Sequence, residues 1–302
     1  MEEAVDSEKA GKYWGEFHNK VRPALSWLES PHIVERVNFR LTGDKDENIY
    51  QKFHRTSSRK FTRALMIGCG AGELERDLLK MGLFESCLGI DISKLSIEKA
   101  KNDATEMGIE NIQYRVFDLD HDNYAELGQF DLIIIQMVAH HVSDLRYFFK
   151  NVNAMLRDNK SKVLMNEYIG PNRFQHDEKT RAIINFLLRS IPEKYKLNHL
   201  TDGISLREEY LLTPVSHFLA NDPSEAIRSE EITKFAKKYL RIKNTLPYGG
   251  AINHMLLTGI ISNFDLHNPD GELLSLLSSF EELMESLNVI TSDFAVILAD
   301  KK

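Results

Sequence analysis

Three glycines at alternate positions make up the stretch of this chain whose spacing points most directly to chemistry. Residues 64–67 form a short apolar run, and Gly68, Gly70 and Gly72 follow it directly. A strand buried on both faces of a parallel sheet has such an uninterrupted run, and glycines allow a sharp turn into a helix whose free amides face a ligand. A side chain at Gly68 or Gly70 would occupy the ligand's space. The pattern predicts a site for a nucleotide-like cofactor, with a purely structural turn as the alternative.

Acidic residues end the two apolar runs that come next. Asp91 closes the run at 87–91 and lies 19 positions after Gly72. Nucleotide-binding folds place an acid that binds ribose hydroxyls about 20 residues after the glycines. Asp118 follows a third run at 112–117. We expect Asp91 to hold a ribose; its alternative role is to cap the helix that follows.

Two adjacent histidines, His140 and His141, follow a fourth apolar run at 130–136. An imidazole with an ordinary pKa near 6.5 suits a general base at neutral pH, so both are candidate catalytic residues. The alternatives are that one of them caps the following helix or hydrogen-bonds the main chain of the cofactor. Adjacent side chains point in different directions, and no H-x-x-x-H pattern surrounds the pair. The sequence therefore predicts no metal site.

Helices and strands must alternate to bring these residues together. Residues 73–81 and 94–107 carry apolar side chains at the spacing of one helical face. A fifth apolar run at 162–168 extends the series of strands. Strands that alternate with helices form a doubly wound parallel sheet, whose ligands bind at the carboxyl ends of the strands. The sequence thus predicts an α/β fold with the glycines, the acids and the histidines at one edge of the sheet.

These motifs resemble those of class I S-adenosylmethionine-dependent methyltransferases. Residues 65–72 are similar to the first motif of that family, 89–93 to its ribose-binding second strand, Phe117-Asp118 to its adenine-side acid, and 130–141 to its fourth strand. The G-x-G-x-G spacing, with Glu73 where a dinucleotide fold would continue toward a last glycine, favours S-adenosylmethionine over NAD. The resemblance implies a Rossmann-like sheet of seven strands. It also implies S-adenosylmethionine as cofactor, S-adenosylhomocysteine as product, and these cofactor-binding residues: Gly68, Cys69, Gly70, Gly72, Asp91, Ile92, Asp118, Leu119 and Gln136.

Other stretches resemble a group of bacterial-type small-molecule methyltransferases of this class that carry a helical lid after the fifth strand. The resemblance implies a lid in this chain, for which we expect residues 170–230, but it names no substrate. The stretches that carry it are residues 36–44, 167–175, 222–229 and 248–250.

The chain is expected to divide into four segments. In the N-terminal segment (1–60), Tyr13 and Trp14 either close the pocket or, as we favour, are buried in the core. In the C-terminal segment (231–302), strands at 240–246 and 293–299 complete the sheet, and the helices between these strands pack on it. The segments are a helical N-terminal cover over the cofactor end of the sheet (1–60), the cofactor-binding core (61–169), the helical lid (170–230) and the C-terminal part of the core (231–302).

Three residues beyond the fifth strand are candidates for substrate contacts. Tyr168 and Arg173 follow that strand closely, and Arg228 lies near the end of the expected lid. An arginine can clamp a carboxylate or a phosphate through its planar fork. The alternatives are structural: Arg173 would pair with Glu167 or with an acid of the lid, and Arg228 would form a salt bridge within the lid.

Composition limits the partners and the compartment. The 302 residues include 45 acidic and 38 basic ones, for a net charge of -7, which disfavours a protein that coats nucleic acid. The two cysteines, Cys69 and Cys87, are too few for a disulfide framework and fit a reducing cytoplasm. The chain shows no apolar stretch of about 18 residues and no signal peptide. We expect a cytoplasmic protein without a membrane partner, and the oligomeric state is left open.

The function that fits these expectations is methyl transfer from S-adenosylmethionine to a small molecule at an oxygen atom. The acceptor would displace the sulfonium in line, without a covalent intermediate. Two alternatives stand beside it. The chain could methylate a macromolecule, RNA or protein, or it could be a noncatalytic module that binds S-adenosylmethionine.

Overall fold

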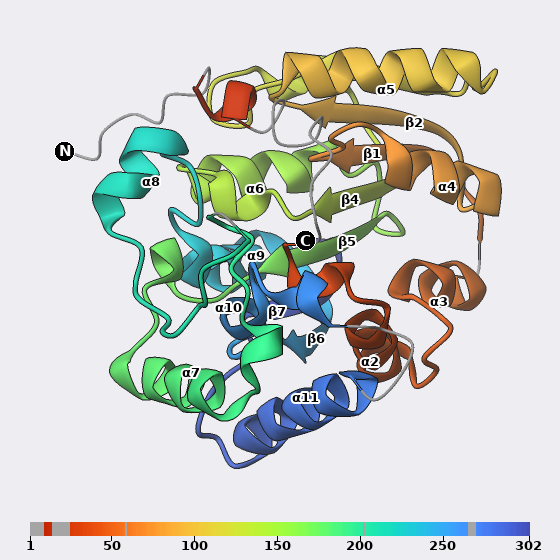
Figure 1. The fold of residues 1–302 in the computed structure, drawn as a ribbon. Coiled ribbons are helices and arrows are strands. Elements are labelled where there is room, and N and C mark those ends of the chain that lie inside the picture. Colours follow the sequence, from red (N-terminus) through yellow and green to blue (C-terminus); the bar gives the residue numbers. More distant parts are fainter. Residues whose placement is uncertain (1–8, 14–24, 58, 202, 265–269) are drawn as a thin grey trace.

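Seven strands form one sheet at the centre of the molecule (Figure 1). The first five run parallel, whereas β7 lies antiparallel between β5 and β6. The order β3-β2-β1-β4-β5-β7-β6 confirms the predicted doubly wound sheet of seven strands. The computed structural model describes residues 9–13, 25–57, 59–201, 203–264 and 270–302. The strands are β1 (Phe61–Ile67), β2 (Phe84–Asp91), β3 (Ile112–Val116), β4 (Leu132–Gln136), β5 (Lys162–Tyr168), β6 (Leu240–Gly249) and β7 (Phe294–Lys301).

The apolar runs form strands because both faces of the sheet are covered. Successive side chains of β1 point to opposite faces: Ala64 and Met66 belong to one hydrophobic cluster, and Leu65 and Ile67 to the other. All four side chains are fully buried. The two clusters form separate cores, one on each face of the sheet, as an almost continuous apolar strand requires.

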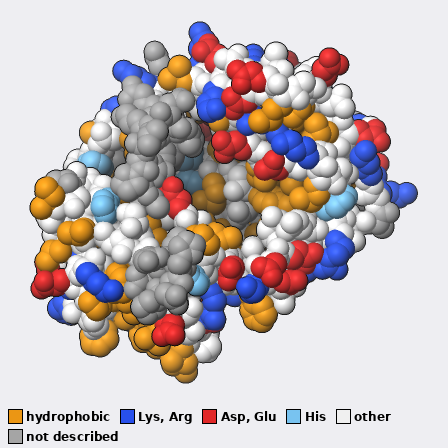
Figure 2. All heavy atoms as spheres, turned by 45° about the vertical axis from the view of Figure 1, so that its right-hand side comes forward, with side chains coloured by type: hydrophobic (Ala, Val, Ile, Leu, Met, Phe, Trp, Pro, Cys, Tyr) orange, Lys and Arg blue, Asp and Glu red, His pale blue; other side chains and the backbone are white. Residues whose placement is uncertain are grey.

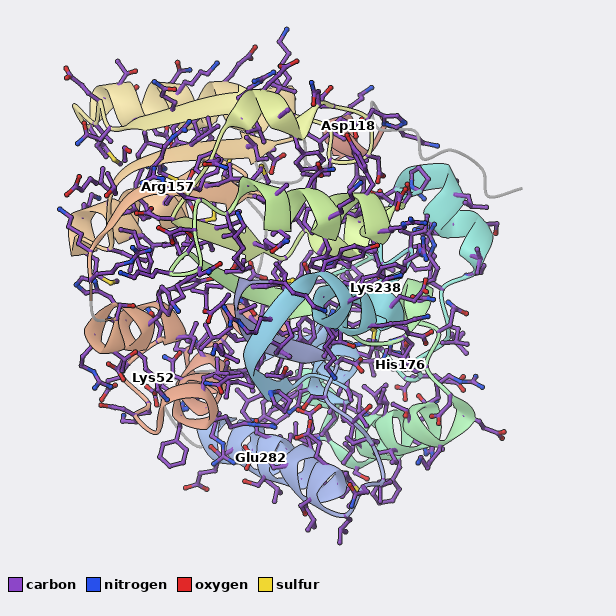
Figure 3. The ribbon with its side chains drawn as sticks, turned by 180° about the vertical axis from the view of Figure 1, so that it is seen from behind. Lys52, Asp118, Arg157, His176, Lys238 and Glu282 are labelled. Carbon is purple, nitrogen blue, oxygen red and sulfur yellow. The ribbon has the colours of Figure 1, made fainter. Side chains whose placement is uncertain are left out.

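Two pairs of helices cover the two faces of the sheet. Buried residues of α4 (Glu73–Met81) and α5 (Lys94–Glu106) belong to the first core, and those of α6 (Leu145–Met155) and α9 (Ile232–Tyr239) belong to the second. Figure 3 shows α6 and α9 lying across the rear face. The predicted bounds of α4 are confirmed, and α5 ends one residue before the predicted end. The Oγ of Ser93 accepts a hydrogen bond from the amide of Ser96, so Ser93, rather than Asp91, caps α5.

The C-terminal segment completes the sheet, but one of its helices lies elsewhere than expected. The chain between β6 and β7 contains α10 (Asn253–Leu257) and α11 (Asp270–Ser286). Instead of packing on the sheet, α11 lies beside α2 (Pro31–Thr42) at the periphery (Figure 1). Helix α2 packs against β6, and α11 packs against α2, so α11 lies in a layer outside α2.

Ion pairs join α11 to α2. The guanidinium of Arg36 lies 2.8 Å from Glu282, and that of Arg40 lies 2.6 Å from Glu285. The second pair is the better shielded, with side chains 21% and 14% exposed. These pairs join segments more than 240 residues apart, which no local pattern could indicate.

The expected cover and lid both contain helices. In the described residues of the cover these are a helical stretch at 9–13, α2, α3 (Ile49–Thr56) and a short turn at 27–29. Tyr13 is 41% exposed, so its expected burial is wrong, and Trp14 lies outside the described residues. In the lid, α7 (Glu178–Ser190) and α8 (Val215–Asn221) are separated by turns and extended chain. None of the helices in the described part of the chain combines the length and apolar character needed to cross a bilayer.

Candidate active site

A cavity of about 840 Å³ lies at the carboxyl ends of the parallel strands. Its wall includes the loops after β1, β2 and β4, together with Ser224 and Glu225 of the lid. Ala10 and residues 25–28 line it from the N-terminal side, where the sequence predicted a cover. The face shown in Figure 2 is hollowed near its centre, with hydrophobic and acidic side chains around the recess. This is the position at which a doubly wound sheet binds its ligands.

Most of the predicted cofactor-binding residues meet at one end of this cavity. Asp91 both lines the cavity and holds the glycine loop, because its carboxylate accepts hydrogen bonds from the amides of Gly70 and Ser93, each at 2.9 Å. The loop and the second strand are therefore fixed to each other before any ligand arrives. The predicted residues that line the cavity are Gly68, Cys69, Gly70, Asp91, Ile92, Asp118, Leu119 and Gln136.

Gly72 is the predicted residue that does not line the cavity. Its φ of 81° is left-handed, and an added Cβ would lie 2.5 Å from both Arg76 Nη1 and the hydroxyl of Tyr114. Gly68 also has a left-handed φ, of 76°, and its Cβ would lie 2.7 Å from that of Val138. Close packing therefore requires glycine at both positions. At Gly68 this packing adds to the expected reason, which is that a side chain there would occupy the ligand's space.

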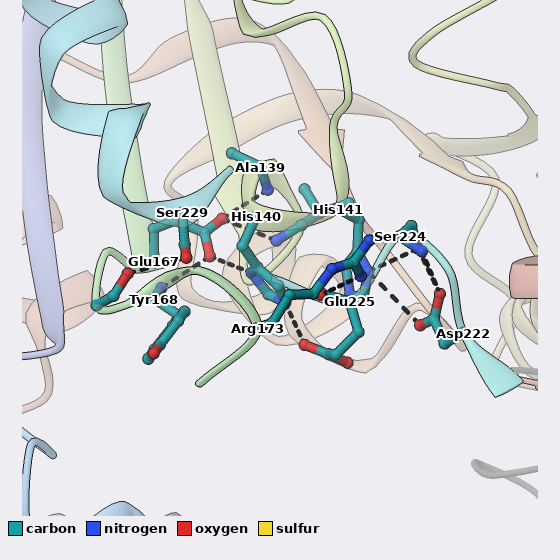
Figure 4. Close-up of polar contacts among 12 residues, drawn as sticks. Ala139, His140, His141, Glu167, Tyr168, Arg173, Asp222, Ser224, Glu225 and Ser229 are labelled. Carbon is teal, nitrogen blue, oxygen red and sulfur yellow. Dashed lines mark hydrogen bonds and ion pairs between the residues drawn. The ribbon is translucent and has the colours of Figure 1, made fainter. Parts of the chain in front are cut away.

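The other end of the cavity contains the two histidines. His140 lies between two carboxylates: its Nδ1 is hydrogen-bonded to Glu167, and its Nε2 lies 3.6 Å from Glu225 Oε1. Glu167, fully buried at the end of β5, also accepts the amide of Ala139 at 2.6 Å and that of Val138 at 2.9 Å. Figure 4 shows this arrangement.

The lid returns to the histidines through residues 222–229. His141 Nδ1 lies 2.9 Å from the hydroxyl of Ser224, which itself donates to Asp222. The amide of Ile227 donates to the carbonyl of His140 at 3.0 Å. The lid therefore contacts the loop after β4 through both side chains and backbone. We call His140, His141, Glu167, Ser224 and Glu225 the histidine cluster.

Burial and neighbouring charges move the pKa values of both histidines away from the ordinary value. Burial alone would lower the pKa of His140, but the charges of Glu167 and Glu225 outweigh it and raise this pKa to about 9. Burial and the positive charges of His140 and Arg173 hold the pKa of His141 well below the ordinary range. At neutral pH His140 is therefore protonated and His141 is a weak base. The expectation of two imidazoles with pKa values near 6.5 is wrong, and neither suits a general base at neutral pH.

Glu225 is a member of the cluster that the sequence did not indicate. Burial raises the pKa of its carboxyl to about 7, against the opposing effect of His140. Glu167 was considered only as a partner for Arg173. Both acids stood within stretches that resemble other methyltransferases, but no sequence signal shows that residues 222–229 return to the loop after β4.

The two arginines expected to bind substrate lie outside the cavity wall. The guanidinium of Arg173 donates to the carbonyls of Pro223 and Glu225, each at 2.6 Å. That of Arg228 donates to the carbonyl of Ser143 at 2.9 Å and pairs with Glu231 at 2.7 Å. Both therefore brace the lid. The donors of both arginines thus have partners in the protein, which favours their structural alternatives. Arg173 binds backbone carbonyls of the lid instead of Glu167 or an acidic side chain of the lid.

Aromatic side chains line the cavity beside the histidine cluster. Tyr168, the third residue expected to contact substrate, lines the cavity with its ring, and its hydroxyl donates to the carbonyl of Pro171 at 2.9 Å. Its ring lies 4.8 Å from that of Phe174 and 5.2 Å from that of Phe294. Trp27 completes this wall. These rings come from three segments that are distant in sequence, around residues 27, 168–174 and 294, and the sequence indicated only the segment that follows β5.

Comparison with known proteins agrees with this geometry. Residues 65–163 match the methyltransferase domain family. The uncharacterized methyltransferase YcgJ of Bacillus subtilis is 30% identical over 106 residues, which are 35% of this chain and 41% of that protein. The ubiquinone biosynthesis O-methyltransferase of Pelagibacter ubique is 34% identical over 116 residues, 37% of this chain and 46% of that protein.

Two solved structures show the same fold over the whole chain. The geranyl diphosphate C-methyltransferase of Streptomyces coelicolor, crystallised with Mg²⁺, geranyl-S-thiolodiphosphate and S-adenosylhomocysteine, has a TM-score of 0.55 at 11% identity and covers 100% of both chains. The [4+2]-cyclase SpnF has a TM-score of 0.52 at 10% identity and covers 99% of this chain and 97% of its own. The second protein shows that the fold alone does not fix the reaction.

The chain therefore contains a class I methyltransferase domain, which confirms the family predicted from the glycines, the two acids and the fourth strand. The NAD alternative is set aside by the same match. The sequence alignments span less than half the length of YcgJ and of the ubiquinone biosynthesis O-methyltransferase.

Proposed function

We propose that this protein transfers the methyl group of S-adenosylmethionine to an oxygen atom of a small molecule. The observation that carries the proposal is a single cavity that joins the glycine loop and Asp91 at one end to His140 and His141 at the other. The domain match supports the cofactor, and the O-methyltransferase among the relatives supports oxygen as the acceptor.

The residues at the glycine end suit the parts of this cofactor. The carboxylate of Asp91 can accept hydrogen bonds from ribose hydroxyls, as an acid at the end of a second strand does in nucleotide-binding folds. Ile92 and Leu119 offer apolar surfaces to the adenine, and Asp118 offers an acceptor for its amino group. Gly68 and its neighbours leave the backbone accessible to the methionine part.

The reaction requires alignment more than acid–base chemistry. The acceptor oxygen forms a bond to the methyl carbon as the carbon–sulfur bond breaks, the sulfonium becomes a neutral thioether, and the hydroxyl proton passes to water. The reacting atoms must stand about 3 Å apart and in line. We assign to His140, His141 and Glu225 the task of holding the acceptor there, and to the aromatic wall that of excluding water.

The site supports a small acceptor more than a macromolecule. The lid contacts the loop after β4 and contributes Ser224 and Glu225 to the wall of the cavity. A cavity of about 840 Å³ suits a small molecule, and the net charge of -7 is unfavourable for RNA. Two free, buried cysteines fit the reducing cytoplasm as the place of action.

A calorimetric titration with S-adenosylmethionine and with S-adenosylhomocysteine tests the cofactor assignment. The proposal predicts saturable heats at one site per chain, and incubation of the methyl-labelled cofactor with pooled hydroxylated metabolites should then give labelled small molecules. Binding without transfer to any acceptor class would favour the noncatalytic module, and no saturable heat for either compound would remove the proposal.

A further inference from the structure

Three side chains of the kinds that bind metal ions meet at the histidine end of the cavity. One ligand atom from each of His140, His141 and Glu225 lies within 4.8 Å of the other two, and all three residues line the cavity. The histidines belong to the turn after β4, whereas Glu225 comes from the lid. The group forms because the lid packs against that turn, so spacing along the chain cannot reveal it.

The carboxylate of Glu225 lacks the hydrogen bonds that a shielded charge requires. Its side chain is 16% exposed, and its ion-pair contact is with His140 Nε2 at 3.6 Å, which is longer than a hydrogen bond. No donor from the described residues reaches either oxygen. The carboxylate lines the cavity, so water or a ligand there must supply the partners that the protein does not. A bound cation would supply the missing interaction.

The Nδ1 atom of each imidazole has a polar partner, as is usual for one nitrogen of a histidine in a metal site. A histidine that binds a metal through one nitrogen usually has its other nitrogen bonded to a carboxylate or another polar group, which fixes the ring. His140 Nδ1 is bonded to Glu167, and Glu167 is itself fixed by two backbone amides. His141 Nδ1 is bonded to Ser224. The ring centroids lie 4.2 Å apart, so the adjacent histidines converge here.

We propose that His140, His141 and Glu225 bind a divalent ion of the first transition series at the acceptor end of the cavity. The ion takes the place of the Nε2 proton of His140, which passes to water. Two imidazoles and one carboxylate suit Zn²⁺, Mn²⁺ or Fe²⁺, whereas Mg²⁺ prefers oxygen ligands and keeps its water. This proposal replaces the expectation of no metal, which considered the histidines without the carboxylate of the lid.

An ion held by these three residues would lie at the wall of the cavity, since all three line it. An acceptor hydroxyl bound there ionises more readily, and its proton passes to water before the oxygen attacks the methyl carbon. This role rests on the proposed methyl transfer. The binding of the ion does not, and it can be measured without cofactor or acceptor.

Titration of the chelator-treated full chain with Zn²⁺ and with Co²⁺ tests the site. We expect one equivalent of each ion to bind, and the cobalt form to show visible absorption bands of nitrogen coordination. Glu225→Gln and His141→Asn should each weaken Zn²⁺ binding by about 100-fold or more, since loss of even an outer partner of a metal ligand costs up to about that factor. His217→Asn, which changes an exposed histidine of α8, is the matched control and should bind as the parent does.

Thermal unfolding by circular dichroism establishes that each variant is folded before its affinity is compared. The proposal is overturned if the parent binds no stoichiometric ion, or if folded Glu225→Gln and His141→Asn bind Zn²⁺ as tightly as the parent. A separate titration with S-adenosylhomocysteine keeps the two proposals apart. Its failure would remove the methyl-transfer function and leave the metal site standing.

Discussion

The two ends of the cavity are built from different kinds of contact. The cofactor end consists of short segments, residues 68–70, 91–92 and 118–119, each following its own strand. The histidine end joins a turn after β4 to the end of β5 and to a lid segment some 80 residues further on. A ligand site can thus be local in sequence at one end and entirely nonlocal at the other.

Electrostatics separates the two ends as well. At the cofactor end the carboxylate of Asp91 already has two amide partners. At the histidine end Glu225 has no hydrogen-bond donor from the described residues, and the pKa values of both histidines are strongly shifted. Shifted pKa values in a cavity are typical of functional groups. We infer that the first end is ready for its ligand, and that the second is completed by its ligand.

The largest expected effect comes from the buried acid at the histidine end. Glu167→Gln removes the charge that balances His140 and weakens the acceptor of two backbone amides. Breaking a buried pair costs about 3–5 kcal/mol, so the free energy of unfolding measured in urea should fall by that amount. Glu126→Gln alters an exposed pair with Arg115 and should change it by less than about 1 kcal/mol. Equal stability of the two variants would contradict this account of Glu167.

An acid near the cofactor end provides the comparison with Glu225. Glu75 of α4 is fully buried away from the cavity, its oxygens have no hydrogen-bond partner among the described residues, and burial raises its pKa to about 7. Because the folded-state pKa lies above the unfolded one, the stability that this group contributes is complete below pH 4.5 and is lost as the pH rises through 7.

Glu75→Gln should therefore be more stable than the parent at pH 8, by up to about 3 kcal/mol. The difference should vanish below pH 4.5, and urea unfolding at a series of pH values measures it. Asp77→Asn, on the exposed side of the same helix, should show no such trend. A difference that is independent of pH would show that Glu75 is not forced to ionise within the core.

Affinity for the cofactor should depend on residues at the cofactor end of the cavity and not on those at the histidine end. Asp91→Ala removes acceptors for ribose hydroxyls and for the amide of Gly70, and hydrogen bonds to charged groups are worth about 1.5–3 kcal/mol each. Affinity for S-adenosylhomocysteine should fall by about 10²-fold in calorimetry. His141→Asn at the opposite end and Asp77→Ala on the surface should leave it within about twofold. A loss of similar size in His141→Asn would erase the distinction between the ends.

The smallest expected effect concerns the contact between the lid and the histidines. Arg173→Ala removes two hydrogen bonds to the carbonyls of Pro223 and Glu225. Hydrogen exchange in residues 222–227 should accelerate about tenfold or more, while exchange in α4 stays unchanged. Arg189→Ala on the exposed side of α7 is the control. Unchanged exchange in residues 222–227 would mean that Arg173 does not hold this part of the lid.

The same division explains how much could be predicted from the sequence. The strand order, the bounds of α4 and the residues around Gly68 and Asp91 follow local patterns that each strand and its turn carry by themselves. Glu225 became visible only in the folded chain, because its role depends on a lid segment that packs against His140. The sequence left the role of Arg173 open for a related reason, since a guanidinium that binds backbone carbonyls has the same sequence signature as one that binds a ligand.

A crystal structure with S-adenosylhomocysteine tests the central claim most directly, namely that one cavity joins the cofactor end to the histidine cluster. The account predicts the adenosyl group against Asp91 and Asp118, with the sulfur atom facing His140 and His141. A cofactor bound outside this cavity, or bound within it with its sulfur directed away from the histidines, would contradict the account.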